Sequence, residues 1–219
     1  MTPRSEWLST GLYEYLVAHC TPRDTVLEEL AAETLERYPA DAGMQIGHEQ
    51  GAFMTVVTRL TGATRAVEVG TFTGYSSICL ARGLADGGRL LCCDVSEEWT
   101  ALARRYWDKA GVGDRIDLRL GPALDTLRAL PADTTFDLAF IDADKTGYPA
   151  YWDEIVPRIR PGGILLIDNT LSHGAVVDPA AQSPNVRAIR EFNEHAARDG
   201  RVEVTILPIG DGLTLAYKK

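Results

Sequence analysis

Acidic and amide side chains follow two apolar runs of the sequence. FIDADK carries Asp142 and Asp144 with Lys145 directly after them, and LLIDN carries Asp168 and Asn169. Both runs read as buried parallel strands, whose carboxyl ends meet at one edge of a sheet. Like charges placed that closely destabilise one another unless they share a cation, and hard oxygen ligands suit Mg²⁺, Ca²⁺ or Mn²⁺ better than zinc. We therefore expect three carboxylates and an amide to converge on a divalent cation, Mg²⁺ in the first place.

Lys145 stands directly after these acids and could act as a base. A neutral phenol is a poor nucleophile at pH 7, but two adjacent hydroxyls on a divalent cation would have one pKa lowered by the field of the ion. A lysine beside the same ion could then take the proton. The structural alternative is that Asp168 and Asn169 cap a loop, and that Asp144 and Lys145 form a surface ion pair.

A glycine turn, Glu68-Val-Gly-Thr-Phe-Thr-Gly74, follows another apolar run. Its spacing is neither that of a dinucleotide-binding turn nor that of a phosphate loop. Glu68 would repel phosphate but suits a ligand with an amino group and a cationic sulfonium, such as S-adenosylmethionine. The next run ends at Asp94, which could accept hydrogen bonds from ribose hydroxyls. A tight turn without a ligand, with Asp94 as a helix N-cap, is the alternative.

The elements that position these residues alternate between strands and helices. From Arg65 onward, stretches with helical spacing follow each of five apolar runs, namely AVEVG, RLLCCDV, RIDLRL, FDLAFID and GGILLIDN. This alternation predicts an α/β fold with a parallel sheet covered on both faces. RVEVTILPIG and GLTLAYKK are joined through Gly210-Asp211-Gly212 and predict a terminal hairpin that places one strand against the rest.

The first 60 residues show helical spacing and little strand character. A first helix is predicted to carry its apolar side chains on one face, at Trp7, Leu8, Leu12, Tyr15 and Leu16. Two more helical stretches follow at 26–38 and 48–60. We expect a single domain over 1–219, with a helical lead-in or lid over 1–62 and a cofactor- and metal-binding core over 63–219.

The composition of the chain limits which classes of molecule the protein is expected to bind. The net charge of −9 opposes nucleic-acid binding, and no cluster of lysine and arginine offsets it. The four cysteines form no CxxC pair, which indicates neither a disulfide framework nor a zinc site. No apolar run of about 18 residues could span a bilayer, and the start lacks the order of a signal peptide. We expect a cytoplasmic protein that binds a small molecule and neither nucleic acid nor a membrane.

Several motifs together resemble one enzyme family. They are VEVGTFTGYS, GPALD, FIDADK, GGILLIDNTL and the ending DGLTLAYKK, and the similarity runs from about Met44 to the C-terminus. The chain is similar to the cation-dependent class I O-methyltransferases of the caffeoyl-CoA and catechol type. The resemblance implies a Rossmann-like class I fold with seven strands, of which the last but one in space is antiparallel. It also implies S-adenosylmethionine as methyl donor and a homodimer.

The same resemblance implies roles for individual residues. It places cofactor contacts at Met44, Ile46, Glu68, Gly70, Thr71, Ser76, Asp94, Ala123 and Asp142. It places the metal ligands at Asp142, Asp168 and Asn169. It makes Lys145 the catalytic base beside Asp142, and it gives His173 a position that contacts substrate in plant relatives, where the residue is usually asparagine. We add Tyr148 and Trp152 as rings that could flank the substrate. The alternatives are that Met44 and Ile46 start a buried helix, that His173 is a polar loop residue, and that both rings belong to the core.

The sequence differs from the family in features that indicate which molecule accepts the methyl group. No cluster of arginine and lysine stands in the N-terminal segment or between Val176 and Asn185 to bind a large anionic thioester. We therefore expect a hydroxyl of a small, catechol-like phenol to be methylated. A caffeoyl-CoA-like thioester, or a non-catechol acceptor such as an antibiotic or sugar hydroxyl, remains the alternative. A non-catalytic cofactor-binding module is disfavoured because Lys145 and Asp168 are both present, and a nicotinamide oxidoreductase is disfavoured by the glycine spacing.

Overall fold

The computed structural model describes residues 7–219, so the first six residues of the expected lead-in lie outside it. Within these residues, seven strands form one sheet in the order β3-β2-β1-β4-β5-β7-β6. β7 is antiparallel to β5 and β6, and the other neighbouring pairs are parallel. The predicted fold is confirmed. The strands are β1 (Arg65–Val69), β2 (Arg89–Asp94), β3 (Ile116–Leu120), β4 (Phe136–Ile141), β5 (Ile159–Ile167), β6 (Val202–Leu207) and β7 (Leu213–Lys218).

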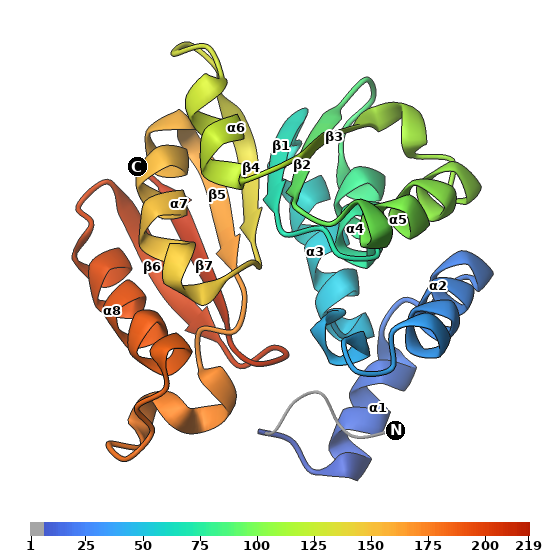
Figure 1. Cartoon of the computed structure of the whole chain (residues 1–219), viewed down its shortest axis with the longest axis horizontal. Coiled ribbons are helices and arrows are strands. Elements are labelled where there is room, and N and C mark those ends of the chain that lie inside the picture. Colours follow the sequence, from blue (N-terminus) through green and yellow to red (C-terminus); the bar gives the residue numbers. More distant parts are fainter. Residues whose placement is uncertain (1–6) are drawn as a thin grey trace.

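Helices connect these strands and precede the first of them (Figure 1). The α-helices are α1 (Thr10–His19), α2 (Thr25–Arg37), α3 (His48–Thr61), α4 (Tyr75–Gly83), α5 (Glu97–Lys109), α6 (Ala123–Ala129), α7 (Tyr148–Ile155) and α8 (Pro184–Arg198). Short 3₁₀ helices are η1 (Ala42–Met44), η2 (Gly113–Arg115), η3 (Lys145–Gly147), η4 (Val156–Arg158) and η5 (Ser172–Val177). None of the described helices is long and apolar enough to cross a membrane.

Alternating side chains of the central strands fill two hydrophobic cores, one on each face of the sheet. On β4, Leu138 and Phe140 belong to the core shared with α3 and α4, whereas Ala139 and Ile141 belong to the core shared with α6, α7 and α8. Figure 1 shows these two groups of helices on opposite sides of the sheet. A strand buried on both faces is apolar throughout, which is why the sequence shows continuous runs rather than alternation.

The strand order of the sheet reverses between β1 and β4. β1 and β4 are neighbours, and β2 and β3 lie beyond β1 while β5 lies beyond β4. In open α/β sheets, such a switch point leaves a crevice at the carboxyl ends of the two central strands. The fold therefore places the glycine turn after β1 beside the acidic segment after β4.

The first helix departs from the predicted pattern. Trp7, Leu12 and Tyr15 are exposed, and in α1 the buried residue is Tyr13. The Tyr13 hydroxyl donates a hydrogen bond of 2.9 Å to a carboxylate oxygen of Glu49, in the first turn of α3. Leu16 and Val17, three and four residues after Tyr13, are half-buried. The side of α1 that faces the protein therefore carries Tyr13, Leu16 and Val17, of which only Leu16 belongs to the predicted stripe.

Candidate active site

A cleft of about 800 Å³ lies at the carboxyl ends of the parallel strands. Most of the predicted site residues line it, namely Met44, Ile46, Gly70, Thr71, Ser76, Asp94, Ala123, Asp142, Lys145, Asn169 and His173. Three others, Glu68, Tyr148 and Asp168, are buried and do not belong to its lining. Most of the site residues that the sequence predicted therefore share one cleft, and Glu68, Tyr148 and Asp168 are buried outside its lining.

The glycine turn bends sharply into the start of α4. Gly70 has φ of 90° and Gly74, which precedes the helix, has φ of 89°, both in the left-handed region that favours glycine. A β-carbon on Gly70 would collide with the backbone carbonyl of Asp142, and one on Gly74 would collide with Trp107 and Ala103. The turn thus depends on glycine at both positions, and the first glycine brings the turn against the end of β4.

Asp94 holds the glycine turn in place. One of its carboxylate oxygens accepts hydrogen bonds of 2.9 Å from the backbone N–H groups of Thr71 and Phe72, and the other accepts one of 2.8 Å from Ser96. The N-cap of α5 is Ser96, whose hydroxyl oxygen accepts from the Trp99 N–H, so the helix-cap alternative for Asp94 is wrong. Its carboxylate still lines the cleft, with lone pairs left over for a ligand.

Glu68 lies under the same turn. It is fully buried, and one of its oxygens accepts hydrogen bonds from Ser77 at 2.5 Å and from Thr71 and Cys92 at 3.2 Å. Its other oxygen has no partner among the described residues. Burial raises the pKa of Glu68 to about 7, against the hydrogen bonds that lower it. The carboxyl group supports the turn from below, and its contact with a cofactor stays a prediction.

An aromatic pair on the cleft wall was not anticipated. The rings of Phe72 and Trp99 pack edge to face with centroids 5.1 Å apart, and both residues line the cleft near Asp94. Phe72 sits within the glycine turn with φ of 51°, and Trp99 lies in the first turn of α5. Both residues could have been predicted from the sequence, because each stands a few positions after a predicted site residue, Phe72 after Thr71 and Trp99 after Asp94.

Lys145 links the two segments that carry Asp142, after β4, and Asp168, after β5; we call these two strand ends the acidic edge. Its ammonium donates to an Asp142 carboxylate oxygen at 2.9 Å and to the Tyr148 hydroxyl at 2.7 Å. The Tyr148 hydroxyl in turn donates to the backbone carbonyl of Asp168 at 3.2 Å. The ends of β4 and β5 are therefore linked through one lysine and one tyrosine.

Asp168 is the most deeply buried acid of this edge. One of its carboxylate oxygens accepts a 2.8 Å hydrogen bond from the N–H of Asn169, whose φ of 59° is in the left-handed region. Burial, and then the nearby charge of Asp142, raise the pKa of Asp168 to about 7. The nearby charge of Lys145 acts in the opposite direction and does not outweigh these two effects, so a further positive charge would favour the ionised form of Asp168.

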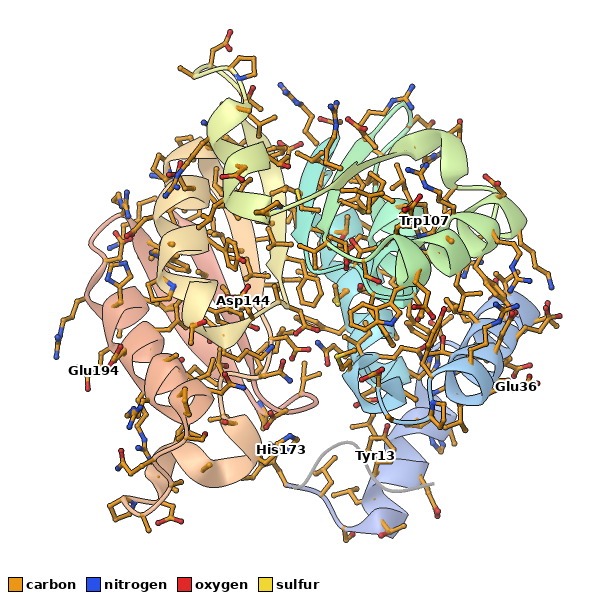
Figure 2. All side chains as sticks on the ribbon, viewed as in Figure 1. Tyr13, Glu36, Trp107, Asp144, His173 and Glu194 are labelled. Atoms are coloured by element: carbon orange, nitrogen blue, oxygen red, sulfur yellow. The ribbon has the colours of Figure 1, made fainter. Side chains whose placement is uncertain are left out.

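Asp144 does not join the other two carboxylates. It accepts a 2.6 Å hydrogen bond from the Tyr151 hydroxyl and one of 3.3 Å from Thr146; Figure 2 shows it at the start of α7. Within residues 7–219, no group of three or more histidine, cysteine, aspartate or glutamate side chains gathers as a metal site. The expected convergence of three carboxylates is therefore corrected to two, Asp142 and Asp168, which lie close enough for the charge of Asp142 to act on Asp168. Asn169 lines the cleft directly after Asp168, and its role as a metal ligand stays a prediction.

Two rings expected near the substrate lie in the core. Tyr148 and Trp152 are both fully buried, and each packs edge to face against Phe192 of α8. The Trp152 indole N–H donates to Asp199 at 2.9 Å. The structure gives Tyr148 a contact with Lys145 in place of a position on the cleft wall.

His173 lies at the rim of the cleft, where its side chain is 68% exposed. Its backbone N–H donates to a carboxylate oxygen of Asp211, and its ring nitrogen Nε2 lies 3.5 Å from the other oxygen. Asp211 also lines the cleft, yet sequence analysis assigned it only to a hairpin turn. No local pattern would have revealed it, because the contact joins segments 38 residues apart.

Similarity to known proteins agrees with this geometry. A family model described as O-methyltransferase matches residues 18–219. The chain is 39% identical to probable caffeoyl-CoA O-methyltransferase 1 of Dictyostelium discoideum, over 96% of this chain and 93% of that protein. It is 40% identical to catechol O-methyltransferase domain-containing protein 1 of Mus musculus, over 94% and 79%. The O-methyltransferase from Bacillus cereus, solved in complex with SAH, superposes with a TM-score of 0.87 at 35% identity, over 96% and 98%.

The fold and the cleft thus define a Rossmann-like methyltransferase. The chain belongs to the O-methyltransferase family and is an enzyme that transfers the methyl group of S-adenosylmethionine to an oxygen atom.

Proposed function

We propose that the enzyme methylates one hydroxyl of a small, catechol-like phenol, held on a divalent cation by Asp142, Asp168 and Asn169. The observation that carries this proposal is that Asp142 and Asp168 lie close together at the ends of β4 and β5, beside the glycine turn, with Asn169 next on the cleft wall. Methyl transfer is an in-line displacement, so the nucleophilic oxygen must be deprotonated, close and aligned. Each of these requirements can be assigned to a group at this edge of the sheet.

The donor set fits a divalent cation. Asp168 is buried next to the charge of Asp142, and the raised pKa of Asp168 reflects the cost of keeping two like charges close in a water-poor environment. A divalent cation would remove that cost, and two carboxylates with an amide oxygen match the preference of Mg²⁺, with Ca²⁺ or Mn²⁺ as alternatives. When bound, the cation lowers the pKa of a coordinated hydroxyl.

Lys145 is proposed as the base that receives the hydroxyl proton at its Nζ atom. It can do so only as the neutral amine, the form that a divalent cation bound beside it would favour over the ammonium. Two hydrogen bonds, from Nζ to Asp142 and to Tyr148, hold the side chain at the cleft wall. Because the Tyr148 proton is directed to the Asp168 carbonyl, the tyrosine oxygen presents its lone pairs to Lys145. Tyr148 is therefore a positioning residue, and it orients the lysine from within the core.

The cofactor is proposed to occupy the glycine-turn half of the cleft. Gly70, Thr71 and Ser76 would contact its methionine end, and Asp94 its ribose hydroxyls. Ala123, with Phe72 and Trp99, would border the adenine, and Met44 and Ile46 would cover the cofactor from the lead-in. All of these side chains line one continuous cleft, which supports the assignment.

The charge of the cleft supports a small acceptor without a large anionic tail. No arginine lines the described cleft, and Lys145, the lysine on its wall, is already paired with Asp142. Carboxylates are more numerous there, at Asp94, Asp142, Asp144 and Asp211. A coenzyme A thioester would bring several phosphate charges without counter-charges to receive them. This favours a free phenol over the thioester that some relatives are named for.

A methyl-transfer assay tests the proposal. We expect turnover of catechol and substituted catechols with added Mg²⁺, and loss of turnover in excess chelator that is restored by adding the cation back. Full activity in chelator would overturn the metal mechanism. Turnover of a monohydroxyl sugar or antibiotic, or of a caffeoyl thioester, in preference to every catechol would favour those acceptors instead. The homodimer implied by the family stays a prediction, which light scattering after size-exclusion chromatography tests.

A further inference from the structure

The glycine turn has a strained backbone at Phe72. The φ of this residue, 51°, is left-handed, as are those of Gly70 and Gly74, at 90° and 89°. Glycine adopts such angles freely but phenylalanine does not, so this conformation of Phe72 persists only where surrounding contacts enforce it. Because Phe72 lines the proposed cofactor half of the cleft, the contacts that hold it also determine how well the cofactor is bound.

One set of contacts joins Phe72 to β2 and α5. Its backbone N–H donates to Asp94, the last residue of β2, at 2.9 Å. Its ring packs edge to face against Trp99 of α5, with centroids 5.1 Å apart. Both partners line the cleft themselves, so they belong to the site that the glycine turn helps to form.

Helix α2 of the lead-in supplies a second set of contacts to the same turn. The Thr34 hydroxyl donates to the Thr73 hydroxyl at 2.9 Å, and both side chains are buried. Tyr38, the C-cap of α2, packs against the Phe72 ring with centroids 6.3 Å apart, within the range of a favourable aromatic pair. Positions 34 and 38 lie about one helical turn apart on the same face, and they contact two consecutive residues of the glycine turn.

α2 is itself fixed to the helices around the turn (Figure 1). Leu27 and Leu30 of α2 are buried in the core that also contains side chains of α4 and α5. The Tyr106 hydroxyl of α5 donates to the Glu33 carboxylate of α2 at 2.8 Å. α4 begins directly after the glycine turn and α5 carries Trp99, so α2 is joined to the same elements as the turn.

We propose that Thr34 and Tyr38 are positioning residues that hold the glycine turn in the conformation that binds S-adenosylmethionine, so that the cofactor site extends into the lead-in as far as α2. This rests on the proposed function, because it assumes that the cofactor occupies the glycine-turn half of the cleft. Neither residue lines the cleft, so Thr34 acts through Thr73 and Tyr38 acts through Phe72. A turn already held in its binding conformation lowers the entropic cost of binding.

The test measures the affinity for S-adenosylhomocysteine by calorimetry, without acceptor or metal. T34V keeps the shape of the side chain but leaves the buried Thr73 oxygen without its donor, so we expect about fivefold weaker binding. T34S restores a hydroxyl and should recover most of this loss. T58V is the matched control, since Thr58 is a buried threonine of α3 whose hydroxyl donates to the Met54 carbonyl. It should bind within about twofold of wild type.

Tyr38 gives an independent test, because it is only half-buried and its replacement leaves the core intact. Y38L removes the ring that packs on Phe72 and should weaken binding by about threefold. Y38F keeps the ring and should bind as wild type does. Amide hydrogen exchange in the protein free of cofactor should show faster exchange of the Phe72 N–H in T34V and Y38L, but not in T58V or Y38F.

The double variant T34V/T73V separates positioning from a general effect on folding. If Thr34 acts through Thr73, adding T34V to T73V weakens binding by less than about twofold. An undiminished effect of T34V without Thr73, or equal losses of affinity in T34V and T58V, would overturn the inference alone. Wild-type affinity in T34V or in Y38L would do the same. Failure of the wild-type protein to bind S-adenosylhomocysteine would overturn the proposed cofactor site and this inference with it.

Discussion

Gly70 and Asp142 are packed so closely that a β-carbon at Gly70 would overlap the backbone carbonyl of Asp142. Gly70 begins the proposed cofactor turn, and Asp142 begins the acidic edge. Their backbones are also linked through β1, since the Asp142 N–H donates to the Val69 carbonyl at 2.8 Å. The distance between the proposed cofactor turn and the proposed metal ligand Asp142 is therefore set by backbone contact rather than by adjustable side chains.

G70A should disrupt both halves of the cleft at once. The added methyl group meets backbone, which cannot move aside as a flexible side chain would, and alanine is strained at φ of 90°. We expect the free energy of unfolding to fall by at least about 2 kcal/mol. We also expect weaker binding of S-adenosylmethionine, and both effects can be measured by denaturant titration and calorimetry.

G11A is the control for this substitution. Gly11 lies in α1 with open space around its α-carbon and without a positive φ, so alanine there should stabilise the protein by about 0.5 to 1 kcal/mol. If G70A unfolded at the same denaturant concentration as wild type and bound the cofactor normally, the close approach of Gly70 to Asp142 would have no functional importance.

The strands could be predicted because apolar runs buried on both faces differ sharply from the helical stretches between them. The acidic edge followed, since parallel strands place their carboxyl ends together. Contacts between distant segments could not be predicted in this way. Asp211 reaches His173 across 38 residues, and Tyr148 turns into the core because Phe192 of α8 packs against it. The exposed apolar side chains of α1 mislead for the same reason, because the buried side of that helix carries Tyr13, which contacts Glu49 of α3 from 36 residues away.

D168N should separate metal binding from folding. The amide keeps the shape of the side chain but removes the charge, so we expect Mn²⁺ affinity to fall by about 10- to 100-fold or more. Binding of S-adenosylhomocysteine should change little, because Asp168 does not line the cleft. Electron paramagnetic resonance and calorimetry measure the two affinities. Mn²⁺ binding equal to that of wild type would exclude Asp168 as a ligand.

K145A should lower kcat by roughly 10² to 10⁴-fold if Lys145 receives the hydroxyl proton. Y148F removes the oxygen that accepts from the Lys145 ammonium but keeps the buried ring, so a smaller loss, about tenfold, is expected. K109A is the matched control, since Lys109 lies on α5 and pairs with Glu29 away from the cleft. Steady-state kinetics in saturating metal and cofactor measure these rates. A K145A enzyme as fast as wild type would assign deprotonation to the metal alone.

E68Q should remove part of the pH dependence of stability in the protein free of metal and cofactor. The pKa of Glu68 is raised from 4.5 to about 7 in the folded state. The stabilising contribution of the protonated acid is therefore complete below about pH 4.5 and is lost as the pH rises through 7.

The expected loss in the wild-type protein is about 3 kcal/mol, because the unfolded chain ionises Glu68 well before the folded protein does. Glutamine cannot ionise, so E68Q should lack this loss and be more stable than wild type at pH 8, with E36Q as an exposed control. Asp168 titrates over an overlapping range, and the comparison is therefore made in the D168N background. Urea denaturation between pH 5 and 8 measures the difference. Identical pH profiles for D168N and E68Q/D168N would show that Glu68 is ionised throughout, with its charge fully balanced by the Ser77, Thr71 and Cys92 donors.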